Sequence, residues 1–315
     1  MDVQNNKTLL IKGCLCMSLI LSGCGGQSLS EREIVRGVLF TKQAQSYSVC
    51  LVLADQNAEG AQPESNKVSA AQGTMPAQAL ARAEQALYGD VYYGLLDLAA
   101  LPADVDWATA CEMGELLYEN AQPAPELSVF VLDDEPIASW AKQGAMLYKN
   151  MKAVEDTYQV HCGLQQLFAQ REICAIPAYT AGGGYDFVLL PQYGQQIRCH
   201  GLAEAQLAAV LCGQADRLQG TFSDGAATCE ARAQVTVEGN KVQLHLRDAS
   251  LSALGPSAPE DLENALQKEL QDRFYALYET MQKSGADPFH LNFWQACTYG
   301  PGSVMEKPEL ELLLE

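Results

Sequence analysis

The chain has 315 residues, of which 48% are hydrophobic and 19% charged, so it is long enough to bury a core in two domains or in one large one. Acidic residues outnumber basic residues by 39 to 20, which gives a formal net charge of −19. Because nucleic acids and anionic phospholipids bind positive surfaces, this charge excludes them as expected partners, and any attachment to a membrane must be hydrophobic.

The first 23 residues have the layout of a secretory signal. Lys7 and Lys12 supply positive charge, and residues 13–21 form a short apolar run. That run has about half of the roughly 20 apolar residues that a membrane-spanning helix needs. We therefore predict a signal peptide over residues 1–23 and no permanent span.

The last residues of this segment and the cysteine after it match a bacterial lipobox. Leu21, Ser22 and Gly23 precede Cys24, the residue that would receive diacylglycerol. An ordinary signal peptide with an incidental cysteine is the alternative. Each buried CH₂ group contributes about 0.8 kcal/mol, so two acyl chains hold a protein at a membrane stably. We expect cleavage before Cys24 and a lipid anchor outside the cytoplasm.

Eight further cysteines follow Cys24, an even number that permits disulfides. None of them forms a CxxC pair, and the pairs His161-Cys162 and Cys199-His200 lack the ligand spacing of structural zinc sites. Cys50 and Cys212 lie among apolar neighbours. The pattern favours buried free thiols and no metal.

The first elements after the anchor form a predicted β-hairpin. Residues 34–40 and 47–53 have the composition and alternation of strands, joined over residues 42–45. A polar stretch that contains Gly, Ala and Ser follows at residues 55–73.

Helices and one buried strand are predicted next. Thr74 is the expected N-cap of a helix that Gly89 ends. The apolar run at residues 127–132 indicates a buried strand, and helical sequence resumes over residues 145–156 and 161–170. Residues 177–192 contain glycines and prolines and are expected to be irregular. The domain boundary is placed there, which gives an N-terminal α+β domain over 24–192 and a C-terminal one over 193–315.

The C-terminal domain is predicted to contain a hairpin and one long helix. Residues 230–237 and 242–246 flank the turn sequence EGNK, with His245 on the outer face. The capping box Ser257/Glu260 is expected to start the helix, and Gly285 to end it. The apolar stripe of this helix comprises Leu262, Leu266, Leu270, Phe274, Leu277 and Met281. The final PELELLLE is expected to be an edge strand.

Sequence motifs of catalysis are absent. The chain has no P-loop, Rossmann glycine pattern, HExxH or G-x-S-x-G. Spacing suggests no acidic or serine partner for His161, His200 or His245. We therefore expect no enzyme and no cofactor.

One segment, KSGADPFHLNFW at residues 283–294, has two interpretations. Asp287 and His290 can be read as an acid/base pair. Alternatively, Asp287, Pro288 and Phe289 form a structural junction, in which Asp287 accepts backbone N–H bonds and Phe289 fills the core. The sequence favours the junction, because Asp-Pro follows a helix-ending glycine.

A long amphipathic helix followed by GADPF, on a chain with a lipobox, resembles the C-terminal domain of the Ger(x)C family, the lipoprotein C subunits of spore germinant receptors. REIV, GVLF and SYSVCLVL are similar to the opening of that family, and GTMPAQAL is similar to its first helix start. LYKNMKAVED and AIPAY lie where the family has a helix leading to a strand. The chain differs in having Gly25-Gly26 after the cysteine, where Trp-Asp is usual, and His290 after DPF, where glycine is usual.

The resemblance implies a membrane-tethered α+β protein of successive small domains, each a mixed or antiparallel sheet with packed helices. It implies no enzymatic activity, a position on the outer face of the spore inner membrane, and two partners: a polytopic A subunit and a transporter-like B subunit. The alternative is a lipid-anchored solute-binding component of a transporter. The hairpin followed by one long helix argues against that alternative, since such proteins alternate strands and helices in two lobes.

Overall fold

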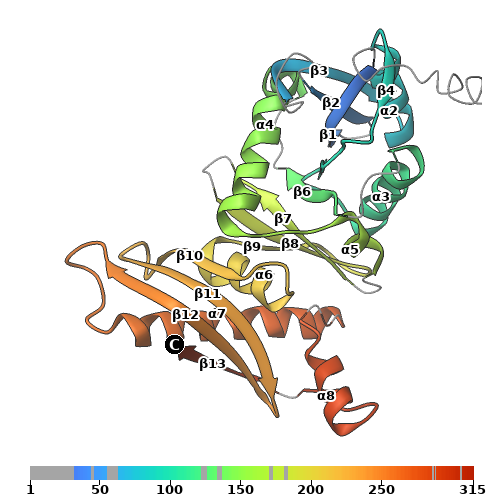
Figure 1. Cartoon of the computed structure of the whole chain (residues 1–315). Helices are drawn as coiled ribbons and strands as arrows, with labels where there is room; N and C mark the ends of the chain where they lie inside the picture. Colours follow the sequence, from blue (N-terminus) through green and yellow to red (C-terminus); the bar gives the residue numbers. More distant parts are fainter. Residues whose placement is uncertain are drawn as a thin grey trace, which may run out of the picture.

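The protein is described by a computed structural model that covers residues 32–43, 46–54, 63–121, 126–132, 137–169, 173–180, 184–285, 287, 289–305 and 307–315 (Figure 1). The predicted signal peptide, Cys24 and Pro288 lie outside these residues. Within the covered ranges, no helix combines the length and the apolar character needed to cross a membrane.

The N-terminal part is built on a large mixed sheet with the strand order β3-β2-β1-β5-β6-β7-β8-β9, and β4 pairs with β1 beside this path. Its strands are β1 (Arg32–Gln43), β2 (Ser46–Ala54), β3 (Pro63–Gly73), β4 (Asp90–Tyr92), β5 (Leu98–Leu101), β6 (Ser128–Leu132), β7 (Ile173–Tyr179), β8 (Tyr185–Pro191) and β9 (Ile197–Cys199). The β1–β2 hairpin and the strand β6 confirm the predictions for residues 34–53 and 127–132.

The middle of this sheet is parallel, because β1, β5, β6 and β7 run in the same direction. Every residue of β5 and β6 is buried. Parallel strands are covered by helices on both faces, so their sequences are continuous apolar runs without alternation. The runs LAAL and SVFVL have this property.

Helices lie on both faces of the large sheet: α2 (Pro76–Gln85), α3 (Trp107–Ala121), α4 (Ile137–Tyr158) and α5 (Leu164–Ala169). The apolar side chains of α2, α3 and α5 pack on one face, and those of α4 pack on the other (Figure 1). This arrangement produces two separate cores, one on each side of the sheet.

The C-terminal part contains the π-helical turn η2 (Leu202–Gln206), the helices α6 (Leu207–Leu211), α7 (Leu262–Ser284) and α8 (Leu291–Tyr299), and the strands β10 (Arg217–Phe222), β11 (Ala227–Glu238), β12 (Lys241–Ala253) and β13 (Glu309–Leu314). The sheet order is β10-β11-β12-β13, with β13 parallel to β12 at the edge. The predicted hairpin and the edge strand are both confirmed. The buried residues of the predicted α7 stripe pack in the same core as Val242, Leu244 and Leu246 of β12.

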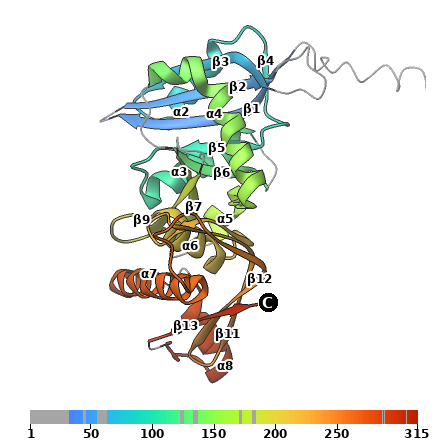
Figure 2. The same cartoon turned by 90° about the vertical axis from the view of Figure 1, so that its left-hand side faces the viewer.

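The two sheets are joined by one continuous apolar core. The cluster that includes the inner residues of α4 also includes Leu207 of α6, Leu244 of β12 and Phe274 of α7. In Figures 1 and 2, α6 lies between the large sheet and the C-terminal sheet. The structure therefore confirms the predicted α+β class, with a mixed sheet and packed helices in each part.

Two stretches for which no strand was predicted contain strands. Residues 63–73 form β3, which pairs with β2 at the edge of the large sheet. Within the stretch 177–192, which was expected to be irregular, residues 177–179 and 185–191 belong to the antiparallel pair β7–β8. The first was missed because an edge strand is held by backbone hydrogen bonds and needs few apolar side chains. The strand β9 follows the predicted domain boundary at residue 192 and pairs with β8. The domain boundary stays a prediction.

The predicted helix caps need correction at two places. The helix α2 begins at Pro76 after Met75, and it ends at Gln85, before Gly89. The side chain of Gln78 accepts a hydrogen bond from the Thr74 backbone, so Thr74 does not cap α2. The helix α7 is capped by Asp261, whose Oδ1 lies 3.0 Å from the Asn264 nitrogen, and Ser257/Glu260 is not the capping box.

Candidate functional site

The junction between α7 and α8 carries the residues that the sequence singled out. Gly285 ends α7 in the left-handed conformation, with φ at 70°, which glycine adopts without a steric penalty. Its N–H donates to the carbonyl oxygen of Gln282. Asp287 and Phe289 follow within four residues, so the chain changes direction between two helices over a very short segment.

The carboxylate of Asp287 accepts hydrogen bonds from the backbone N–H groups at the start of α8. Its Oδ1 accepts from the Leu291 N–H at 2.8 Å, and its Oδ2 accepts from Asn292 at 2.9 Å and from Phe293 at 3.2 Å. The first N–H groups of a helix have no partner inside the helix, and a negative charge there also interacts favourably with the helix dipole. Both carboxylate oxygens are therefore engaged in capping.

Phe289 fills the space between α7 and the start of α8. Its side chain is buried, and its ring centroid lies 6.5 Å from that of Phe274, with the rings inclined by 26°. Phe274 is itself fully buried and also stacks against Tyr278 at 6.3 Å. Aromatic pairs at such distances stabilise a contact beyond the area that they bury.

His290 precedes α8 in a strained backbone conformation. Its φ is 54°, in the left-handed region that is uncommon for residues with a side chain and that glycine adopts without a steric penalty. His290 is exposed, so its side chain does not compensate through burial.

We expect His290→Gly to raise the free energy of unfolding by about 0.5–1 kcal/mol, because relief of the left-handed strain exceeds the entropic cost of glycine. Denaturant-induced unfolding of the two proteins measures the difference. Gly285→Ala is the matched control, with the opposite expected sign, since its φ is also positive. A destabilised His290→Gly variant would contradict this account of the junction.

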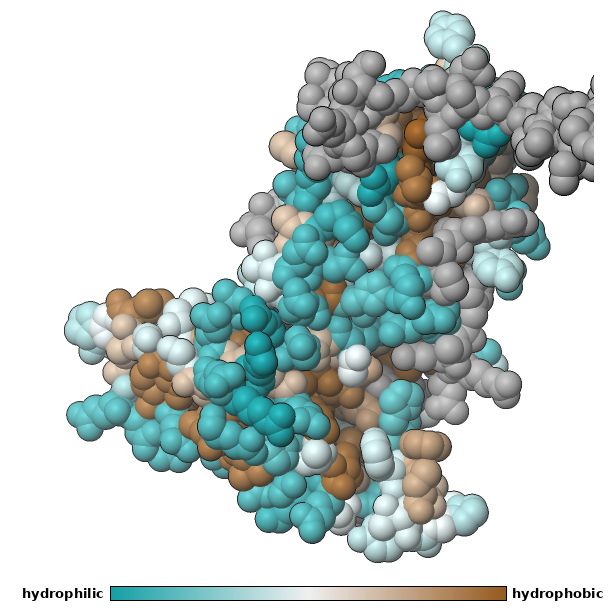
Figure 3. All heavy atoms as spheres, in the orientation of Figure 1, coloured by the Kyte–Doolittle hydropathy of each residue, from teal (hydrophilic) through white to brown (hydrophobic). Residues whose placement is uncertain are grey.

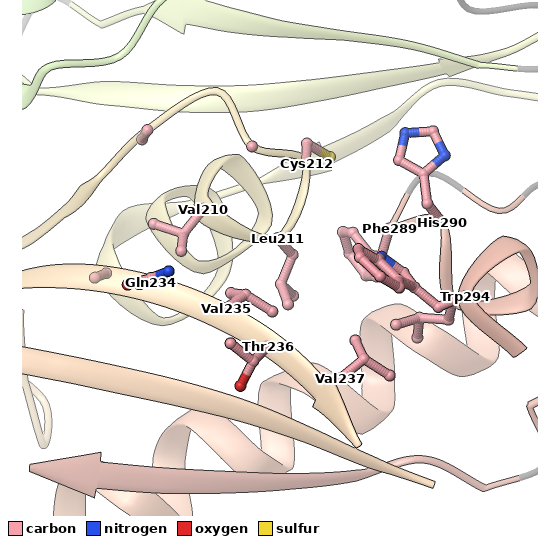
Figure 4. A pocket seen from close by; sticks show the side chains of 14 residues that line it. Val210, Leu211, Cys212, Gln234, Val235, Thr236, Val237, Phe289, His290 and Trp294 are labelled. Carbon is pink, nitrogen blue, oxygen red and sulfur yellow. The ribbon is translucent and has the colours of Figure 1, made fainter. Parts of the chain in front are cut away.

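A groove of about 550 Å³ opens beside this junction (Figure 4). Its walls come from the end of α6, the second half of β11 and the start of α8, and its apolar lining includes Leu211, Val235, Val237, Phe289, Leu291 and Trp294. Trp294 is half exposed, and Phe293 beside it is 61% exposed. On the face shown in Figure 3, hydrophobic atoms emerge between hydrophilic ones in the C-terminal part. The groove can hold apolar side chains of a ligand or partner.

Three histidines have acidic partners that their sequence spacing did not reveal. Nδ1 of His161 lies 2.7 Å from Glu155, and Nδ1 of His200 lies 2.7 Å from Asp186. The spacing of these residues in the sequence suggested neither partner. Folding creates the pairs, because Asp186 lies on β8 while His200 follows β9, the strand paired with it.

The third of these histidines, His245, lies across the sheet from the chain end. Its Nδ1 is 2.8 Å from Glu315, which follows the edge strand β13. Thr236 on β11 contacts the other ring nitrogen at 3.0 Å. This pair ties the edge strand to the outer face of the C-terminal sheet.

The His161 pair belongs to a larger polar network at the end of α4. Burial by itself would raise the pKa of Glu155, but hydrogen bonds from His161, Lys152 and Ser128 outweigh it and hold that pKa at about 2. The hydrogen bond to Glu155 in turn raises the pKa of His161. Ser128 donates to Glu155 and not to His161, so the group does not have the order of a nucleophile, base and acid. It fastens α4 to β6 and to the segment before α5.

The cysteines of the described residues are free thiols, as predicted. Cys50, Cys162, Cys174, Cys199 and Cys229 are buried, and Cys297 is exposed. Burial raises the pKa of the Cys50, Cys162 and Cys199 thiols to about 12, which makes these thiols poor nucleophiles. Among the residues with a described placement, no three His, Cys, Asp or Glu side chains converge on a metal position.

Comparison with known proteins finds similarity only among solved structures. No family model matches the chain, and no curated protein matches it significantly. Among solved structures, the chain is similar to one titled "Crystal Structure of the GerBC protein", with 11% sequence identity and a TM-score of 0.41, over 89% of this chain and 96% of that chain. A similarity of this size assigns no function.

Proposed function

We propose that this protein is a C-type lipoprotein subunit of a spore germinant receptor. It is held by acyl chains on Cys24 at the outer face of the spore inner membrane, and it takes part in nutrient-triggered germination. The observation that carries the proposal is the lipobox ahead of a chain whose order of segments, REIV, AIPAY and GADPF, resembles that of the Ger(x)C family.

The places of these segments in the fold support the proposal. REIV opens β1 in the middle of the large sheet, and AIPAY lies in the buried strand β7. The described residues of GADPF, which are Gly285, Asp287 and Phe289, lie between α7 and α8. Segments that build a core and a helix junction specify a fold, whereas binding surfaces diverge more readily. Shared segments of this kind therefore support a shared architecture.

The subunit works by binding partners and not by catalysis. Asp287, the acid nearest to His290 in the sequence, is engaged with the backbone of α8. The network around Glu155 is saturated by His161, Lys152 and Ser128. The partners are the polytopic A subunit and the transporter-like B subunit of the receptor, together with the membrane that holds the anchor.

Replacing the anchor cysteine tests the tether. We expect Cys24→Ala to move the protein from the membrane fraction to the soluble fraction almost completely, because the acyl chains are lost and the net negative charge offers no electrostatic attachment. Fractionation followed by immunoblotting measures this distribution. Cys297→Ala, a change at an exposed cysteine outside the lipobox, should leave it unchanged.

Two results would refute the proposal. Tight membrane association of Cys24→Ala would exclude the lipid anchor. Normal nutrient germination in a clean deletion strain that has lost uptake of a solute would favour the second candidate, a lipid-anchored solute-binding component of a transporter. The groove volume of about 550 Å³ lies in the usual range for small-molecule sites, so that candidate predicts a raised Tm with the solute.

A further inference from the structure

The second half of β11 has an unpaired edge inside the groove. The strand β10 pairs with β11 only as far as the Arg217–Arg232 pair, and the Ala233 N–H donates to Asp216 at 2.7 Å just beyond it. From there, residues 234–238 continue alongside β12 but have no neighbouring strand on the other side among the described residues. The chain that precedes Asp216 comes from α6 and does not run alongside β11.

The backbone groups that face this open edge can be assigned from the ladder. In an antiparallel sheet, successive residues direct their N–H and C=O groups alternately to the two neighbouring strands. Since Ala233 bonds toward the β10 side, Val235 and Val237 direct their N–H and C=O groups the same way. Two N–H donors and two C=O acceptors therefore line the open edge, which is a template for one more strand.

The groove also determines which side chains such a strand would need. Side chains directly opposite each other in an antiparallel pair lie on the same face of the sheet. Partners of Val235 and Val237 would thus project into the groove, toward Leu211, Phe289 and Trp294 (Figure 4). The residues of the added strand that alternate with these partners would lie on the other face of the sheet, beside the exposed residues Gln234 and Thr236. The matching sequence alternates apolar and polar residues over about five positions.

Charge decides between a second copy of the chain and a different partner. Exposed acidic residues lie at both ends of the open stretch, Asp216 and Glu238. Basic residues lie beside both of them, since Arg217 and Arg232 are close to Asp216 and Lys241 is paired with Glu238, so the attraction for a basic peptide comes from the net charge of the whole chain. Two copies that each carry −19 repel one another, whereas a peptide with lysine or arginine flanks is attracted.

We propose that the edge of β11 at Val235 and Val237 receives an extended segment of a partner protein by strand addition, and that this segment has alternating apolar side chains and basic flanks. The backbone hydrogen bonds supply affinity, and the groove under Leu211 and Trp294 selects the apolar side chains. This inference rests on the geometry of the groove and holds whether or not the protein belongs to a germinant receptor.

The test uses a synthetic peptide of about nine residues, in which valine alternates with threonine and two lysines stand at each end. The control peptide has the same side chains but N-methyl groups on the backbone nitrogens that would pair with the edge. We expect the first peptide to bind the full-length protein and the N-methylated one to bind at least about tenfold more weakly. Isothermal titration calorimetry measures both affinities.

Amide hydrogen exchange locates the contact. The Val235 and Val237 N–H groups should exchange more slowly when the first peptide is bound, while the N–H groups of β12 should be unaffected. Val235→Pro removes one N–H donor from the open edge without removing a hydrogen bond to β12. It should therefore lower the affinity for the peptide at least about tenfold, while the circular dichroism spectrum shows that the fold is retained. A peptide with glutamate in place of the flanking lysines should not bind. In the protein, Glu238→Lys should weaken binding of the peptide with lysine flanks.

Three outcomes would overturn the proposal. Equal affinity for the plain and N-methylated peptides would mean that the groove binds side chains without strand addition. No binding of the plain peptide up to about 1 mM would exclude this class of partner. Self-association of the protein that Val235→Pro abolishes would assign the edge to a second copy.

Discussion

Phe274→Ala is expected to lower the free energy of unfolding by about 3–5 kcal/mol, the usual cost of removing a buried phenylalanine side chain. Phe274 is fully buried in the core that joins the two sheets, and it contacts the rings of Phe289 and Tyr278. The loss leaves a cavity at the point where α7, the junction and the C-terminal sheet meet. Thermal and denaturant unfolding of the purified protein measure the effect.

Tyr275→Ala is the matched control for this prediction. Tyr275 is the next aromatic residue on α7 and is 39% exposed, so its removal should cost no more than about 1 kcal/mol. A Phe274→Ala variant as stable as Tyr275→Ala would show that the stripe of α7 does not hold the C-terminal domain together.

Asp287→Ala is expected to destabilise the protein by about 1–3 kcal/mol, because three backbone N–H groups of α8 lose their acceptor and the helix loses a favourable charge at its start. Asp287→Asn should give an intermediate loss, since its amide retains one oxygen acceptor without the charge. Both variants should show faster amide exchange in the first turn of α8.

An exposed acid in the middle of α7, Asp272, offers the control for Asp287. Asp272→Ala should change stability by less than about 0.5 kcal/mol. The variants also separate the two interpretations of the segment. Lowered stability of Asp287→Asn supports the structural junction, whereas unchanged stability with loss of a measurable activity would support an acid/base role.

Local pattern was sufficient for much of the C-terminal domain. The hairpin β11–β12 and the stripe of α7 were predictable because one face of each element is buried, so apolar residues recur with the period of the backbone. Gly285 was predictable as the end of α7 because few other residues adopt its backbone conformation. The side chains of the edge strand β3 carry no such period, so no strand was predicted there.

The candidate functional site also contains some residues that were predictable from the sequence and others that were not. Asp287 and Phe289 were noticed because Asp-Pro after a glycine is a local signal. The groove beside them was not predictable, because Leu211, Val235 and Trp294 come from three elements that only packing brings together. The acidic partners of His161, His200 and His245 were missed for the same reason.

The sequence by itself determined the features that are read over a few residues: the lipobox at Cys24, the acidic net charge of −19, the amphipathic helix and the turn that follows it. The tertiary structure alone decided the features that depend on distant residues meeting. These are the apolar core shared by the two sheets, the saturated network around Glu155 and the short β10, which leaves one side of Val235 and Val237 without a neighbouring strand among the described residues. The difference is physical: local backbone preference is a property of each segment, whereas burial, pairing and open edges are properties of how segments pack.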